Sequence, residues 1–386
     1  MCYWIDRMRY IVLLLVLVLV SCSHDSEDAI GVPSGQGGVL NVYVYPSDNP
    51  MVTRSDIGPV SVDNLERDVK SLKIWIFKHN EAAGTDLPLH YLAPAEPELQ
   101  GSRAQLFQIA LTETQVEALT GAANLVDVYV LANAASVGLN GLNGTSTRAA
   151  VREALIGSNY FGTSSPTTDI GTNGLPMSGC AEGISVQGSL PVLSLPVVKL
   201  TRCVSKLRFV LVQSDESDMG LSLTGIHLNG NQFPETEHVF NTTSNPYSVS
   251  ATYVANGISF APPSDIAKSD RISDLLYTSQ SAQDYEDLVD AFVARGEATQ
   301  MGPYYFRESD RCLAGSIDYS ITDTEHQVTY KTANFSMNDV PGTYNFSRNH
   351  TWIVYVYYYG GELLQLNLAY ITQWSVEDRE HELYNW

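Results

Sequence analysis

The chain has few basic residues, with 22 Lys and Arg against 43 Asp and Glu among 386 residues, a formal net charge of −21. Proteins that bind nucleic acid neutralise phosphates with clustered Lys and Arg, so this balance argues against that class of protein. It also argues against attachment to anionic lipid through charge alone. Because 44% of the residues are hydrophobic, the chain can still bury a core, which excludes global disorder.

The sequence also lacks the short motifs that mark common catalytic sites. It contains no Gly-x-Ser-x-Gly turn, no Gly-x-x-x-x-Gly-Lys phosphate loop and no His-Glu-x-x-His helix. Its eight histidines are scattered and do not pair at the spacing of metal ligands. We therefore expect no catalysis, no cofactor and no metal site.

Cysteine is scarce as well, because five residues are too few for a disulfide scaffold. Cys2 lies upstream of a second candidate start, and Cys22 has a separate explanation given below. Cys180, Cys203 and Cys312 remain, an odd set that allows one bridge at most. Two alternatives stay open for Cys180 and Cys203, namely a disulfide or a pair of buried thiols.

The N-terminal segment has the pattern of a bacterial lipoprotein signal. Two arginines precede ten apolar residues, 11–20, which as a helix span roughly 15 Å and are too short to cross a bilayer. The run ends in Leu19-Val20-Ser21-Cys22, which resembles a lipobox, in which small residues precede a cysteine that carries the lipid. An ordinary signal peptide with an incidental cysteine is the alternative. We expect a signal peptide over 1–21, then lipidated Cys22 and a flexible tether over 22–38.

Most of the remaining chain has the period-two alternation of β-strands. Leu40, Val42 and Val44 form one apolar face of a strand that stops at Pro46, and we expect this strand to complete a sandwich edge. Further strands are expected over residues 69–77, 125–131, 199–212, 221–228, 317–321, 327–330, 352–359 and 363–371. Gly360-Gly361 between the last two predicts a two-residue hairpin turn.

Short helices are expected as insertions between the strands. Thr112-Glu-Thr-Gln115 has the spacing of a capping box, and residues 147–156 are a second candidate. Residues 281–295 carry an apolar stripe and end at Gly296. Because helices do not alternate with strands, a doubly wound α/β fold is excluded. The sequence predicts a mainly β chain with two domains, 39–198 and 199–386, the second ending in a terminal strand.

Several of these stretches, in their order along the chain, resemble a Bacteroidales-type fimbrillin. They are the lipobox, the first strand with its arginine-containing loop, residues 69–77, Val126-Asp-Val-Tyr-Val-Leu-Ala-Asn-Ala134, Leu200-Thr-Arg-Cys-Val-Ser-Lys-Leu-Arg208, Arg348-Asn349-His350 before a strand, and a late strand ending at Trp374. The resemblance covers essentially the whole chain. It implies two transthyretin-like antiparallel β-sandwich domains with short inserted helices, and a structural subunit of an adhesive cell-surface fimbria, or pilus.

The resemblance also implies how such a subunit is processed and where it lies. In polymerising members a trypsin-like protease cuts after an arginine in the loop that follows the first strand. A strand from the next subunit then fills the groove left by that strand. Arg54 matches this arginine by position, although an ordinary loop arginine is the alternative. Leu364, Leu366 and Leu368 have the alternation of a donor strand. The implied location is the outer membrane surface, through the lipid anchor.

The implied partners are other fimbrial subunits in a head-to-tail polymer, and a host or bacterial surface ligand. Two alternatives remain open from the sequence. The first is a fimbrial anchor or tip subunit that is not polymerised. The second is a glycan-binding surface lipoprotein, for which 22 Tyr and 5 Trp would provide rings that stack on sugars.

The lipobox generates a prediction about membrane attachment. Replacing Cys22 with Ala removes the thiol that would carry the lipid, so the protein should leave the membrane fraction or accumulate as a precursor. Fractionation and electrophoretic mobility measure both effects, with Ser23→Ala as the control. Unchanged attachment and mobility in Cys22→Ala would show that the segment is not a lipoprotein signal.

Overall fold

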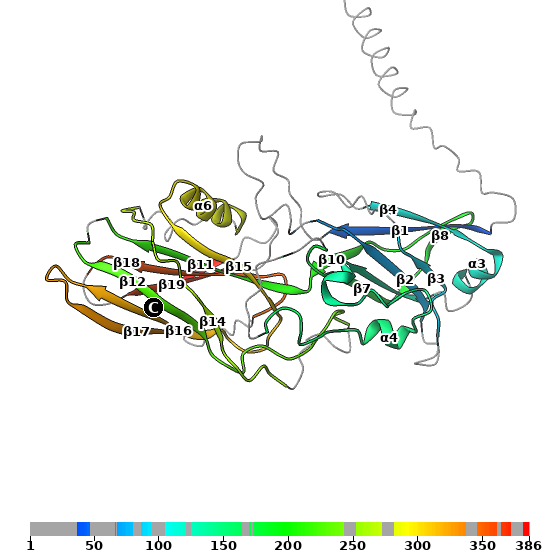
Figure 1. The fold of residues 1–386 in the computed structure, drawn as a ribbon. Helices are drawn as coiled ribbons and strands as arrows, with labels where there is room; N and C mark the ends of the chain where they lie inside the picture. The colour runs from blue at the N-terminus through cyan, green and yellow to red at the C-terminus, as the bar shows by residue number, and fades with distance from the viewer. Residues whose placement is uncertain are drawn as a thin grey trace, which may run out of the picture.

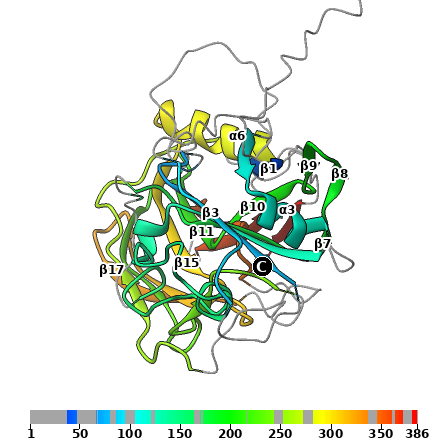
Figure 2. The ribbon, with the colours of Figure 1, turned by 90° about the vertical axis from the view of Figure 1, so that its right-hand side faces the viewer.

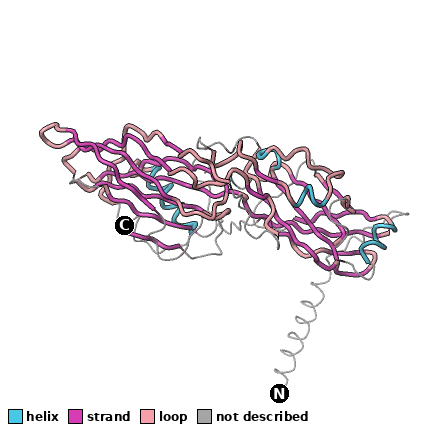
Figure 3. The backbone as a smooth tube through the Cα atoms, turned by 90° about the horizontal axis from the view of Figure 1, so that it is seen from below, coloured by secondary structure: helices cyan, strands magenta, loops and turns pink. Residues whose placement is uncertain are grey.

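The computed structural model describes residues 37–46, 66, 68–79, 86–94, 105–120, 125–163, 170, 173–215, 217–242, 252–271, 282–336, 346–360, 364–371 and 381–385. The predicted signal peptide, Cys22 and Arg54 lie outside these residues. Within them, no helix is long and apolar enough to span a bilayer. The two halves of the chain lie end to end (Figure 1, Figure 3).

The first half forms one nine-stranded sheet that folds over its own core. Its strands are β1 (Gly38–Pro46), β2 (Leu72–Lys78), β3 (His90–Leu92), β4 (Gln105–Leu111), β5 (Leu125–Ala132), β7 (Met177–Ser185), β8 (Gln187–Ser189), β9 (Val192–Ser194) and β10 (Val198–Arg202). Their order is β3-β2-β5-β7-β10-β1-β9-β8, with β4 paired to β1. Val42 and Ile109 share a core with Ile74 and Val128. Strands near opposite ends of the sheet therefore face each other as two layers of a sandwich.

The second half is a sandwich of two separate sheets. One contains β15 (Thr299–Arg307), β11 (Val204–Gln213), β18 (Thr351–Tyr358), β19 (Gln365–Ile371) and β20 (His381–Asn385), in that order. The other contains β14 (Ile258–Phe260), β12 (Gly220–Leu228), β16 (Ala314–Thr322) and β17 (Val328–Ser336). Phe209 and Trp352 of the first sheet pack against Ile226 and Ile317 of the second. A short pair, β6 (Leu155–Ile156) with β13 (Glu237–His238), joins the two halves.

The predicted mainly β fold is confirmed, and most strand pairs are antiparallel. Three pairings are parallel, β1 with β9, β1 with β10 and β11 with β18. The single strand expected over residues 199–212 is two strands that meet at Cys203. They are separate because β10 pairs with β1 and β7 of the first half, whereas β11 pairs with β15 and β18 of the second.

The helices largely follow their predicted positions. Helix α3 (Glu113–Thr120) begins with the predicted capping box, because the Thr112 N–H donates to Gln115 Oε1 (2.9 Å) and the Gln115 N–H donates to Thr112 Oγ1 (3.3 Å). Helix α6 (Ala282–Ala294) buries Phe292 against the outer face of β11 and β18, and the chain turns away at Gly296, whose φ is +71°.

Two local predictions are wrong in part. Only Arg148–Arg152 (α4) of the expected helix 147–156 is helical, because Leu155 and Ile156 pair as β6 with β13; a short 3-10 helix, η1 (Ala134–Val137), comes before it. Strands β18 and β19 form the predicted hairpin, but Tyr357 pairs with Gln365, so the connection is longer than two residues. The ends of the loop bind elsewhere, since the Tyr358 carbonyl accepts from Ser214 N–H and the Leu364 N–H donates to the Tyr319 hydroxyl.

Candidate functional site

Strand β1 is an inner strand of its sheet. On one side it pairs antiparallel with β4, from Gly38 opposite Leu111 to Val44 opposite Gln105. On the other side it runs parallel to β9 and β10. The expectation that this strand completes a sandwich edge is therefore wrong, because β4 covers its outer side. Alternation along one strand shows which face is buried but gives no information about its neighbours in the sheet.

The apolar face of β1 is completely enclosed. Leu40, Val42 and Val44 are each 0% exposed, whereas Asn41 and Tyr43 on the other face are half-buried. Burying a side chain of this size stabilises a protein by roughly 1.5–3 kcal/mol. The burial of these three side chains therefore stabilises the position of β1 by several times the free energy of an average surface contact. Removal of β1 would open an apolar slot.

The backbone of β1 is as important as its side chains. Among the described residues, β4 is hydrogen-bonded to β1 alone. Loss of β1 would therefore leave unpaired N–H and C=O groups on β4 and on the facing sides of β9 and β10. Such groups are strongly favoured to pair again with another extended chain. We call the space between β4 and β9/β10 the β1 slot.

The predicted donor strand already has two partners of its own. Leu364 and Leu366 are 8% and 7% exposed and belong to the core of the second sandwich. Leu368 lies in β19, which pairs with β18 on one side and β20 on the other. The structure therefore places Leu366 and Leu368 in an inner strand, with Leu364 directly before it, and β20 at the edge of that sheet.

Cys180 and Cys203 are free thiols in the structure. The Cys203 thiol donates to Ser178 Oγ (3.3 Å), and the Cys180 thiol donates to the Asn241 carbonyl (2.9 Å). Burial raises the pKa of both thiols to about 11. Burial also raises the pKa of the Cys312 thiol. Thiols with such pKa values are mostly protonated and unreactive at neutral pH.

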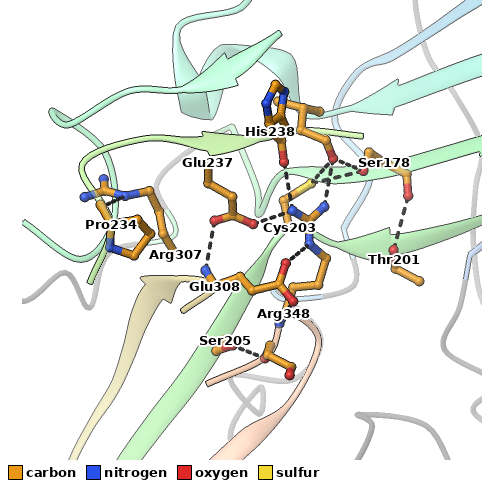
Figure 4. A network of polar contacts seen from close by, with 12 residues as sticks. Ser178, Thr201, Cys203, Ser205, Pro234, Glu237, His238, Arg307, Glu308 and Arg348 are labelled. Carbon is orange, nitrogen blue, oxygen red and sulfur yellow. Dashed lines mark hydrogen bonds and ion pairs between the residues drawn. The ribbon is translucent and has the colours of Figure 1, made fainter. Parts of the chain in front are cut away.

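A cluster of buried charges lies where the two halves meet, and no pattern in the sequence predicts it (Figure 4). The Arg348 guanidinium donates to Glu237 Oε1 (2.5 Å) and to Glu308 Oε2 (3.0 Å). It also donates to the carbonyl oxygen of Val239, and the Glu308 N–H donates to Glu237 Oε2 (2.9 Å). One cation therefore serves two carboxylates inside the protein.

Two further buried cations reach directly from the second half to the first. Arg307 donates to the carbonyl oxygens of Gly157 (3.0 Å) and Tyr160, which belong to a loop of the first half. Lys206 Nζ lies 3.1 Å from Glu66 Oε2, and the Tyr305 hydroxyl donates to the other oxygen of that carboxylate (2.7 Å). Removing one partner of such a pair leaves a buried charge without compensation. These contacts therefore hold the halves in one arrangement.

The pKa values at this junction follow from its burial. Burial raises the pKa of the Glu237 carboxyl to about 8, with Glu308 adding to the effect and Arg348 opposing it. Burial lowers the pKa of Arg307 to about 10. For Arg348 burial also acts to lower the pKa, but the Glu237 and Glu308 carboxylates outweigh it and raise the pKa. The Arg348 cation thus stays charged at neutral pH, whereas burial favours the protonated form of Glu237 against the two donors that favour its carboxylate.

The outer face of the four-stranded sheet carries a row of polar side chains that crosses all four strands. His227 Nδ1 lies 2.9 Å from Ser259 Oγ and His227 Nε2 lies 3.2 Å from Asp318 Oδ2, while the Thr332 hydroxyl donates to Asp318 Oδ1 (2.7 Å). Catalysis by a Ser-His-Asp set depends on a site that excludes water and stabilises an oxyanion. His227 and Asp318 are about 40% exposed, so we interpret the row as cross-strand support. In the described part of the chain no three metal-ligating side chains gather.

Comparison with known proteins supports the fold. No sequence family and no curated protein matches this chain. It is similar in structure to a "putative cell adhesion protein" from Parabacteroides distasonis, with a TM-score of 0.52 at 13% identity over 87% of this chain and 97% of that one. For a protein of the same description from Bacteroides eggerthii, the TM-score is 0.46 at 10% identity, over 89% of this chain and 98% of that one. For a fimbrial assembly protein from P. distasonis, the TM-score is 0.42 at 14% identity, over 90% of this chain and 99% of that one.

The likeness with a TM-score above 0.5 spans both halves of the chain. At this level of identity it concerns the fold alone. The chain therefore has the two-sandwich fold of a Bacteroidales protein described as an adhesion protein, and the fimbrillin-type resemblance seen in the sequence is confirmed at the level of the fold.

The raised pKa of Glu237 predicts a dependence of stability on pH. The folded protein keeps this proton up to about pH 8, whereas an unfolded glutamate releases it near pH 4.3. The stabilisation is therefore fully present below pH 4 and is lost as the pH rises through 8. Glu237→Gln should flatten the fall in unfolding free energy between pH 5 and 8 by up to about 1.4 kcal/mol per pH unit.

Urea unfolding at several pH values measures this effect. Glu235→Gln is the matched control, because Glu235 is an exposed carboxyl on the same segment. Parallel pH profiles for the original protein and Glu237→Gln would show that the Glu237 carboxyl is ionised in the folded state.

Proposed function

We propose that this chain is a non-catalytic structural subunit of an adhesive cell-surface fimbria, assembled by strand exchange. The observation that carries the proposal is the β1 slot. A single strand with three fully buried side chains is held between β4 and β9/β10. This strand ends at Pro46, and Arg54 comes only eight positions later in the sequence. The fold shared with a described adhesion protein of Parabacteroides distasonis supports the same function.

The proposal includes export and anchoring. Residues 1–21 act as a signal peptide, and Cys22 carries a lipid that holds the protein at the outer membrane surface. We place the end of the tether before Gly38, where β1 begins, and we place the boundary between the two domains, predicted at 198/199, at Cys203, because β10 (Val198–Arg202) belongs to the first sheet. The lipobox pattern Leu19-Val20-Ser21-Cys22 and the flexible composition after it support this part of the proposal.

Assembly follows from the physics of the slot. A cut after Arg54 separates β1 from the covalent chain, so only non-covalent contacts still hold it in the sheet. Its departure exposes an apolar groove and two rows of unpaired backbone groups, which a strand of another subunit can satisfy. Because donor and slot are different surfaces, the contact is head-to-tail and propagates as an open filament.

We assign the role of donor strand to the last strands of the chain, β19 and β20. Leu364, Leu366 and Leu368 repeat the spacing of Leu40, Val42 and Val44, but Leu366 and Leu368 lie in β19, an inner strand, and Leu364 directly precedes it. Strand β20 is at the edge of its sheet and pairs with β19 alone among the described residues. We propose that β20 detaches first and that β19 supplies the side chains that enter the slot.

A second candidate function is glycan binding by the outer face of the four-stranded sheet. Tyr330 is 75% exposed there, on the same face as Thr332 and Asp318. An exposed ring beside hydroxyl and carboxylate groups suits the apolar face and the hydroxyl groups of a sugar. Retention on polysaccharide that falls in Tyr330→Ala would favour this candidate, whereas equal retention of both proteins would count against it.

Cleavage at Arg54 is tested by a pair of variants. Arg54→Ala removes the cutting site, so after treatment with a trypsin-like protease the protein should form no ladder of head-to-tail oligomers on unheated gels. Arg67→Ala is the matched control, because it removes the next arginine of the sequence and should polymerise normally. Normal polymers from Arg54→Ala would contradict cleavage at this site and favour the anchor role.

Synthetic peptides test the donor on the cleaved protein. A peptide of residues 363–371 should bind the emptied slot and raise the melting temperature, because its leucines reproduce the buried spacing of β1. A peptide of residues 381–386 should bind weakly, since it lacks three alternating apolar residues. Stronger binding of the second peptide would assign donation to β20 instead of β19.

A further inference from the structure

Strand β17 is an open edge that the proposed assembly does not use. It is the last strand in the order β14-β12-β16-β17 and, among the described residues, is hydrogen-bonded to β16 alone. Two perpendicular views place it on the outside of the molecule (Figure 1, Figure 2). It lies in the second sandwich, whereas the β1 slot belongs to the first.

The register shows which backbone groups point outward. The Asp323 N–H donates to the Gln327 carbonyl (3.0 Å), so this pair is of the hydrogen-bonded type. Such pairs alternate along an antiparallel ladder, and residues 329, 331, 333 and 335 therefore bond to β16. The N–H and C=O groups of residues 328, 330, 332 and 334 point away from β16.

This edge lacks the features that protect other edges of the same sandwich. Strand β14 has only three residues, and β15 contains Pro303, which has no N–H to offer. Strand β17 has nine residues, no proline and one charged residue, Lys331. Edges that are long, extended and weakly charged are the ones on which another strand is added.

The charge pattern indicates a second copy of this chain as the partner. Two copies with a net charge of −21 repel each other over most of their surfaces, but β17 itself has no carboxylate among its nine residues. The acidic hairpin tip, with Asp323 and Glu325, lies at one end of the strand. Antiparallel pairing places the two tips at opposite ends, whereas parallel pairing would bring them together.

We propose that two copies of this chain pair through β17, antiparallel and with Thr332 opposite Thr332 of the second copy. In this register Lys331 lies opposite Ala333 of the second copy. A register shifted so that residue 330 lies opposite residue 332 of the second copy also joins outward-pointing residues. It would place the two Lys331 side chains opposite each other, which is unfavourable. The contact is a closed two-fold pair, and it can join two filaments side by side.

A proline substitution tests the pairing without disturbing the fold. The Thr332 N–H points away from β16, so Thr332→Pro breaks no internal ladder bond but removes a donor from the shared edge. Thr332→Ala is the matched control, because both variants lose the side-chain bond to Asp318 and only the proline alters the backbone. In sedimentation across a concentration series, the uncut protein and Thr332→Ala should dimerise. Thr332→Pro should remain monomeric, and at low protein concentration its melting temperature should equal that of Thr332→Ala.

Cysteine variants test the register. Facing hydrogen-bonded residues have Cα atoms about 5.5 Å apart, within the range of a disulfide. Thr332→Cys should therefore form a covalent dimer under oxidation, while Tyr330→Cys should not, since it would face Asn334. An uncut protein that stays monomeric, or a Thr332→Pro variant that dimerises like the original, would overturn the proposal. Neither result depends on cleavage at Arg54, so the proposed strand exchange is unaffected.

Discussion

The need to pair every backbone group of a strand controls the first half of this protein. Strand β1 pairs with the backbone groups of β4 on one side and with those of β9 and β10 on the other, and its apolar face completes the core. Without it the sheet would divide into three parts with open edges: β3-β2-β5-β7-β10, β9-β8 and β4 alone. A chain segment with this role can be replaced only by another extended segment, and this requirement is the physical basis of the proposed strand exchange.

The second constraint is the group of buried charges at the junction. Charges in an interior lose their hydration, and they are tolerated only when each has partners of good geometry. Arg307, Arg348 and Lys206 meet this condition with carbonyl oxygens and carboxylates from both halves. Apolar surfaces could slide past one another, but these directional contacts specify one relative position. The junction thus converts two sandwiches into one elongated body (Figure 1).

Local patterns predicted the elements well, because alternation and capping act over a few residues. The capping box at Thr112 and the stripe of α6 are examples. Relations between distant segments could not be predicted in this way. The position of β1 inside its sheet depends on β4, β9 and β10, and the partners of Arg348 lie 40 and 111 residues away. No signal in a single sequence links residues at such separations, so the junction was not predicted at all.

The passage from β10 to β11 has a mechanical consequence. These strands are separated by Cys203 alone, so residues 198–213 run almost unbroken from the inside of the first sandwich to the inside of the second. Both strands are bonded to neighbours on each side. Tension applied to the ends of the molecule is therefore carried by covalent backbone and by ladders loaded in shear, in which many hydrogen bonds must break together. Residues 198–213 thus form a continuous segment that connects the two sandwiches and carries the load between them.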